Sequence, residues 1–275
     1  MIQGTVQSES DSLLHRLNPL SKLVAIGPLA LFLTMTTNVW TPAIFILLIS
    51  CTTIIFGRIS LNIYLKRCAP MLLFVLGFMI FYPLMVSKSV NEGSKLLISF
   101  GFIHVYEAGI IFGTATGLRL LSLLVLSMLF TLTTDTSNFI RALIQQWKVN
   151  YRFGYGTLAV LRFIPILMKQ FKLVKMAHQV RGYTGKSGFS RFIDRIQRYA
   201  LPLLSSSIRH AERTAYSMES RAFGAFPTRT YYRQISMVRK DFIFICAFWL
   251  LSVIVVFILH YYDILGDFSF FKTYH

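Results

Sequence analysis

Acidic side chains are scarce in this chain, which has 11 Asp and Glu among 275 residues and only 14% charged residues in total. The acids form no close pair beside an apolar stretch, the six histidines lie far from one another, and no nucleophile stands next to a general base. Acid–base and nucleophilic catalysis need such groupings, so the sequence argues against an enzyme and predicts no catalytic residue. Acids at membrane depth, which proton-coupled carriers generally need, are almost absent too.

Cysteine is also rare. Cys51, Cys68 and Cys246 are far apart, with neither the spacing of metal ligands nor the even number of a disulfide framework. We therefore predict no metal site. The first 19 residues lack the apolar core of a cleaved signal peptide, so the apolar runs further along are expected to direct the chain to its membrane.

Apolar residues are abundant, at 55% of the chain with 15% aromatic, which is well beyond the composition of a soluble globular protein. Apolar runs long enough, or nearly so, to cross a hydrocarbon layer about 30 Å thick occur at roughly 20–37, 41–57, 69–87, 107–133 and 241–260. We predict an all-α integral membrane protein with about five transmembrane helices. The first two runs are short and close together, which fits either a tight helical hairpin or a partly re-entrant segment.

Positive charge is concentrated in one region. The net charge is +17, and 18 of the 28 Lys and Arg lie between Asp135 and Arg239. In a soluble protein this excess would suggest nucleic acid, but beside membrane spans it indicates the cytoplasmic side, and we expect no nucleic-acid partner. The predicted organisation is transmembrane helices at 1–133, a cytoplasmic helical region at 134–239, and a last transmembrane helix with a tail at 240–275.

The basic region is patterned as long amphipathic helices. After cap candidates at 134–137, an apolar stripe predicts a short helix. Two longer helices are predicted at about 157–181 and 200–222, each with apolar residues three and four positions apart on one face. Basic amphipathic helices lying on anionic lipid are one interpretation of this region.

Both long helices end in a similar pattern, Val180-Arg181-Gly182-Tyr183 and Ser220-Arg221-Ala222-Phe223-Gly224, with the two arginines 40 positions apart. A glycine stands close to each predicted helix end, as is typical of helix termination. We expect two arginines to project from two helix ends toward a common partner. Lipid binding would not require both helices to end in the same way.

Gly109, Gly113 and Gly117 recur at four-residue intervals in the fourth apolar run. They make a smooth strip on which another helix can approach closely, either within this chain or from a separate membrane subunit. Arg119 follows two residues later and is expected to face the bundle, a carbonyl or an interface, since an arginine is costly at membrane depth.

Gly185-Lys186-Ser187 matches the end of a phosphate-binding loop. The required first glycine is replaced by Val180, and a helical pattern, not a strand, precedes it. We therefore expect no ATP binding by this chain.

Several segments together carry a family resemblance: Arg16–Lys22, Thr133–Asp135, Phe163 through Arg181-Gly182, and Pro202 through Arg221. The chain resembles the transmembrane T component of energy-coupling-factor (ECF) transporters, the EcfT and CbiQ group. The resemblance covers most of the chain, from Arg16 to about His260.

In that family, each coupling helix ends in Ala-Arg followed by a small residue, and the two arginines dock into grooves on a pair of ABC-type ATPases. Here Val180 and Ser220 replace the alanines. The resemblance implies an ATPase-docking site formed by Arg181, Gly182, Arg221, Ala222 and Gly224. It also implies no cofactor on this chain, because the partner subunits bind ATP and Mg.

The resemblance further implies a non-catalytic coupling and scaffold subunit of an importer, with 134–239 as its coupling region. Its partners would be two ABC-type ATPase subunits, one substrate-binding membrane protein (the S component) and the lipid bilayer, and its cargo a vitamin or similar micronutrient. A stand-alone secondary carrier with a basic lipid-binding cytoplasmic domain is the alternative, and an integral membrane enzyme is a third class.

Overall fold

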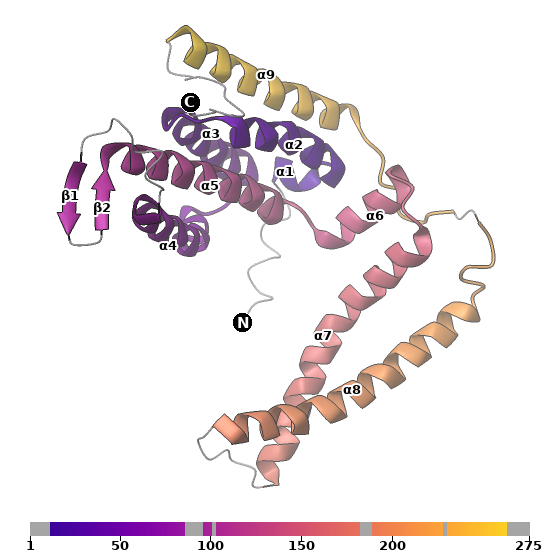
Figure 1. The fold of residues 1–275 in the computed structure, drawn as a ribbon. Helices are drawn as coiled ribbons and strands as arrows, with labels where there is room; N and C mark the ends of the chain where they lie inside the picture. Colours follow the sequence, from indigo (N-terminus) through magenta and orange to yellow (C-terminus); the bar gives the residue numbers. More distant parts are fainter. Residues whose placement is uncertain (1–11, 86–95, 101–102, 182–188, 228–229, 263–275) are drawn as a thin grey trace. The chain divides into compact units, whose positions relative to one another are not determined.

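The structure is a computed structural model that describes residues 12–85, 96–100, 103–181, 189–227 and 230–262 (Figure 1). Its helices are α1 (Leu13–Arg16), α2 (Pro19–Met35), α3 (Trp40–Gly57), α4 (Leu61–Met85), α5 (Glu107–Thr133), α6 (Thr136–Gln146), α7 (Tyr151–Val180), α8 (Phe189–Glu219) and α9 (Arg239–Tyr261). The chain divides into two compact units, Met1–Phe139 with Ser236–His275, and Ile140–Ile235. We call the first the membrane unit and the second the inserted unit, because its sequence interrupts that of the first.

Within the described part of the chain, four helices are long and apolar enough to cross a membrane: α3, α4 over Leu61–Tyr82, α5 and α9. The remaining predicted run, at 20–37, forms α2, which has 17 residues and is shorter than a typical span. The predicted all-α membrane fold is confirmed, with four helices of spanning length and one shorter apolar helix. The predicted division into membrane and cytoplasmic regions at 134 and 239 stays a prediction.

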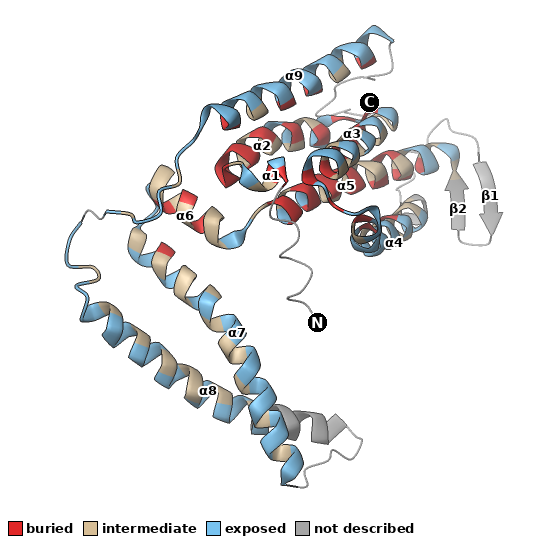
Figure 2. Cartoon of the chain, turned by 180° about the vertical axis from the view of Figure 1, so that it is seen from behind, coloured by how far each residue is buried: buried red, intermediate tan, exposed pale blue. Residues whose placement is uncertain are grey.

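Helix α5 lies against α2, α3 and α4, while α2 also lies against α9. Figure 2 shows buried residues concentrated on α2 and α5. The core contains side chains from five helices: Ala25, Leu29, Leu33, Phe45, Ile49, Val75, Leu121, Val125, Leu126, Leu129 and Phe248. Apolar residues also remain exposed on α3, α4 and α9, as expected for helices that meet lipid.

Helices α2 and α3 follow one another as a hairpin whose turn lies between Thr36 and Trp40. The guanidinium of Arg119 in α5 donates to the carbonyl oxygen of Thr36, the C-cap residue of α2. A helix end leaves carbonyls without partners inside the helix, and such groups are costly in apolar surroundings. The expectation that Arg119 would face the bundle or a carbonyl is confirmed.

The segment between α4 and α5 contains a short β-hairpin that the sequence did not predict. Strands β1 (Leu96–Phe100) and β2 (Ile103–Tyr106) pair antiparallel, with Phe100 opposite Ile103 and Leu96 opposite Tyr106. The hairpin is too short to alter the fold class.

The inserted unit contains most of α6 and all of α7 and α8. Asp135 caps α6, since its carboxylate accepts from the amide of Ser137 (3.2 Å), and Asn150 caps α7 through the amide of Arg152 (3.0 Å). Both long helices begin earlier than predicted, α7 at Tyr151 and α8 at Phe189. The predicted end of α8 at Ala222 was also too late by three residues, because the chain leaves the helix in a left-handed turn after Glu219.

Candidate functional site

The C-terminal end of α8 closes with a Schellman turn that contains no glycine. The amide of Phe223 donates to the carbonyl of Met218 (3.0 Å) and the amide of Ala222 to that of Glu219 (2.9 Å). Ala222 has φ +55°, the left-handed conformation that this turn requires and that glycine usually supplies. Arg221 directly precedes the left-handed residue of this turn and is exposed. Its position is therefore set by a specific backbone geometry.

The segment after the turn is fastened to the first turns of α7. The ring of Phe223 packs edge-on against the rings of Tyr151 (5.8 Å between centroids) and Tyr155 (6.3 Å). The guanidinium of Arg152 donates to the carbonyl of Gly224 (2.7 Å), and the hydroxyl of Tyr151 donates to the carbonyl of Phe226 (2.8 Å). We call residues 222–226 the strap.

Gly224 has φ +88°, a conformation that glycine adopts without strain. The sequence singled out Gly224 as a helix stop; the structure shows that its carbonyl also accepts from Arg152. Sequence reasoning missed Tyr151, Arg152 and Tyr155, because nothing in their local pattern indicates a contact 72 residues away.

Arg181 is the C-cap residue of α7. Its amide donates to the carbonyl of Ala177 (3.3 Å), and its side chain is exposed, as is Val180 before it. The remaining predicted residue, Gly182, lies outside the described residues. So does Lys186 of the sequence Gly185-Lys186-Ser187, which matches the end of a phosphate-binding loop. Arg181 therefore lies at the end of a 30-residue helix, and Arg221 lies two residues after the end of α8.

Helices α7 and α8 lie antiparallel and cross (Figure 1). Four contacts between them establish the direction, since the numbers rise on one helix as they fall on the other: Phe163 with His210, Gln170 with Ser206, and both Phe171 and His178 with Tyr199. The strap then joins the end of α8 to the start of α7.

This arrangement places the two arginines at opposite ends of the helical pair. Arg221 lies at the end where α7 begins, and Arg181 lies where α7 finishes. An α-helix rises 1.5 Å per residue, so 30 residues separate the two ends by about 40 Å. The prediction that both arginines contact a partner stays a prediction, and the structure places them at two separate ends of the pair.

The helical pair also exposes apolar side chains along each helix. On α7 these are Phe153, Val160, Ile164 and Met168, and on α8 they are Leu201, Leu204 and Ile208. The residues of each set are separated by three, four or seven positions, so each set forms one stripe. Exposed stripes of this length indicate contact with a partner or with lipid.

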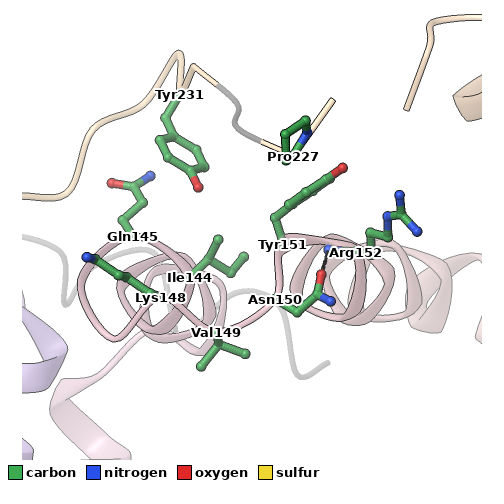
Figure 3. Close-up of a pocket in the computed structure, with 9 residues that line it drawn as sticks. All are labelled: Ile144, Gln145, Lys148, Val149, Asn150, Tyr151, Arg152, Pro227 and Tyr231. Carbon is green, nitrogen blue, oxygen red and sulfur yellow. Dashed lines mark hydrogen bonds between the residues drawn. The ribbon is translucent and has the colours of Figure 1, made fainter. Parts of the chain in front are cut away.

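A pocket of about 630 Å³ lies at the bend between α6 and α7 (Figure 3). Tyr231 stands over Gln145 and Ile144, and Pro227 stands over Tyr151. The other lining residues are Lys148, Val149, Asn150 and Arg152. The described lining contains two cations, Lys148 and Arg152, and neither a carboxylate nor a histidine.

The glycines of α5 pack within this chain. Gly109, Gly113 and Gly117 are all buried, and a methyl group at Gly117 would overlap the side chain of Met79 in α4. The close helix approach at Gly117 is therefore one between α4 and α5. A separate membrane subunit is not needed to explain this position.

Among the residues that the structure describes, no three His, Cys, Asp or Glu side chains come together to hold a metal ion. The expectations that this chain carries no metal, no cofactor and no catalytic residue stay predictions.

Comparison with known proteins supports the resemblance. The family model CbiQ, described as cobalt transport protein, matches residues 10–232. The energy-coupling factor transporter transmembrane protein EcfT of Bacillus subtilis (strain 168) is 28% identical over 256 residues, which is 90% of this chain and 94% of that protein. EcfT of Lactococcus lactis subsp. cremoris (strain MG1363) is 24% identical over 254 residues, 90% of this chain and 93% of that protein. EcfT of Streptococcus thermophilus (strain ATCC BAA-250 / LMG 18311) is 27% identical over 256 residues, 90% and 95%.

The matched region includes the ends of both α7 and α8 and all but one of the membrane helices. A family model that covers this much of the chain decides its membership. The chain therefore belongs to the CbiQ family, whose members include the transmembrane proteins of energy-coupling factor transporters.

Proposed function

We propose that this chain is the non-catalytic coupling subunit of an ECF-type importer in the bacterial plasma membrane. In this function, Arg181 and Arg221 dock into two ABC-type ATPase subunits in the cytoplasm. The ATPases bind ATP and Mg, and their closure on ATP displaces the helical pair. The membrane unit passes this movement to an S component that carries a vitamin or similar micronutrient.

The placement of Arg181 and Arg221 at opposite ends of one antiparallel helical pair is the observation that carries this proposal. Two identical contacts about 40 Å apart fit two copies of similar partners, not one compact ligand. Arginine suits such a contact because its planar guanidinium donates in two directions to carboxylates and carbonyls, and arginine is enriched among residues that dominate binding energy.

The exposed apolar stripes of α7 and α8 support an S component as a further partner, beside the two ATPases. A membrane protein that presents apolar surface to the cytoplasmic side would cover them. Lipid alone would also cover them, which keeps the stand-alone carrier as the alternative function.

Replacing both arginines with glutamate tests the proposal. We expect Arg181→Glu with Arg221→Glu to remove the ATPase subunits from the purified complex, because each lost anchor weakens binding by about 2 kcal/mol or more and the new charge repels the original acceptor. Co-purification with a tagged chain from detergent-solubilised membranes measures this.

The matched control is Arg162→Glu with Arg213→Glu. These two arginines are exposed on the same helices away from their ends and carry the same charge change. If the helix-end variant keeps both ATPases, or if the control loses them equally, Arg181 and Arg221 are not the docking contacts.

A further inference from the structure

The chain leaves the long helices of the membrane unit after Thr133, where α5 ends. It returns to them at Arg239, where α9 begins. These two junctions are more than 100 positions apart in the sequence. The same first turn of α2 contacts both of them.

Lys22 holds the α5 junction. Its ammonium donates to the carbonyl oxygen of Thr133 (2.5 Å), the last residue of α5, and only 1% of Lys22 is exposed. The final carbonyls of a helix have no partner within the helix and carry the negative end of its dipole, so a cation stabilises this position.

Asp241 holds the α9 junction from the first turn of that helix, and it is 3% exposed. One carboxylate oxygen accepts from the amide of Val238 (2.8 Å). The other accepts from the amide of Asn18 (2.8 Å) and lies 3.4 Å from the hydroxyl of Ser21. A carboxylate at a helix N-terminus is favoured by the dipole, and here it also ties α9 to the start of α2.

Burying charged groups costs desolvation energy, and apolar side chains of similar size often stabilise a core as well or better. General packing therefore does not explain why a lysine and an aspartate occupy this position. Fixing two helix ends at one point does explain it, because each charge has a directional partner on a different helix.

We propose that Lys22, Asp241 and Asn18 form a junction anchor, which fixes both ends of the inserted unit to the first turn of α2. With both junctions fixed, a displacement of the helical pair moves α2, α5 and α9 together. Without the anchor, the linkers at 134–135 and 236–238 absorb the displacement. This inference rests on the proposed coupling function and adds the positioning residues through which coupling passes.

The variant Lys22→Met in the assembled transporter tests the anchor, with two readouts. Hydrogen exchange of the amides at 134–139 should accelerate by about tenfold, because Thr133 loses its buried partner. The amides at 236–241 should change little, because Asp241 keeps its bonds to Asn18 and Val238. ATP-dependent uptake should fall by at least the same factor, while the ATPases remain bound and continue to hydrolyse ATP.

The matched control is Lys66→Met, the same change at an exposed lysine of the membrane unit. Normal uptake by Lys22→Met, unchanged exchange at 134–139, or equally faster exchange throughout α2–α5 would each overturn the anchor. If Lys22→Met does not accumulate, Lys22→Met with Asp241→Asn removes both charges. We expect that pair to accumulate without coupling, and normal uptake by it contradicts the anchor.

Failure of the anchor and failure of the proposed function give different results. A wrong docking model appears as ATPases that stay bound when Arg181 and Arg221 are replaced. The exchange measurement on Lys22→Met reports on the α5 junction whether or not the ATPases are present.

Discussion

Ala222 adopts a left-handed backbone conformation that costs a residue with a Cβ roughly 1–2 kcal/mol. Three contacts of the strap offset this cost: the packing of Phe223, the bond from Arg152 to Gly224, and the bond from Tyr151 to Phe226. The direction of the chain at Arg221 is thus imposed by contacts with α7. Residues 222–226 position the arginine although none of them needs to touch a partner.

The side chain at position 222 should therefore control the function of Arg221. Valine is β-branched and is rarely tolerated at positive φ, whereas glycine adopts it freely. We expect Ala222→Val to weaken ATPase binding by about tenfold, equivalent to about 1.4 kcal/mol. We expect Ala222→Gly to keep it. Equilibrium titration of the ATPase subunits onto the reconstituted chain measures both, and equal affinities would show that the turn does not position Arg221.

At the level of secondary-structure elements, the described contacts between α7 and α8 include packed rings and the hydrogen bond from Ser206 to Gln170. The apolar stripes on both helices stay exposed and are available to a third element.

A charge placed in the α8 stripe should separate binding of the S component from binding of the ATPases. We expect Leu204→Glu to remove the S component from the purified complex, since burying an unpaired carboxylate in an apolar interface is costly. The ATPases should remain, because Leu204 is far from both helix ends.

Ser217→Glu is the matched control for this experiment. It adds the same charge at an exposed position of the same helix, on the side opposite the stripe. Retention of the S component by Leu204→Glu, or its loss from both variants, would contradict an interface on this stripe.

At the level of the whole molecule, one unit is apolar and meets the bilayer, and the other carries most of the positive charge. The inserted unit interrupts the membrane unit between α5 and α9, so every covalent connection between them passes through two short linkers. A displacement of the helical pair can reach the membrane unit only through these two linkers or through non-covalent contacts.

The composition of the native complex tests the function as a whole. We expect a tagged chain, purified in mild detergent, to carry two ATPase subunits and one small membrane protein. The chain alone in liposomes should take up no solute under an ion gradient. Gradient-driven uptake without ATPases would instead establish a stand-alone carrier.

Much of the fold could be predicted from residue patterns. Apolar runs located α2, α3, α4, α5 and α9, because span length and hydropathy are local properties. The helix bounds in the inserted unit were less accurate. Helix α7 begins at Tyr151, six residues before the predicted start at 157. Its N-cap Asn150 and the close contact of Gly154 with Ile144 both depend on the bend after α6. The β-hairpin was missed since short strands give little periodicity.

The sequence by itself determined that this protein is a membrane protein with a basic helical region whose two long helices each end at an arginine. Composition, charge placement and helix-stop residues are sufficient for that. Only the tertiary structure decided that Arg181 and Arg221 lie at opposite ends of one pair, that the strap holds Arg221 through α7, and that Lys22 and Asp241 meet both junctions. These features depend on contacts between residues from about 70 to more than 200 positions apart, and no local pattern encodes such contacts.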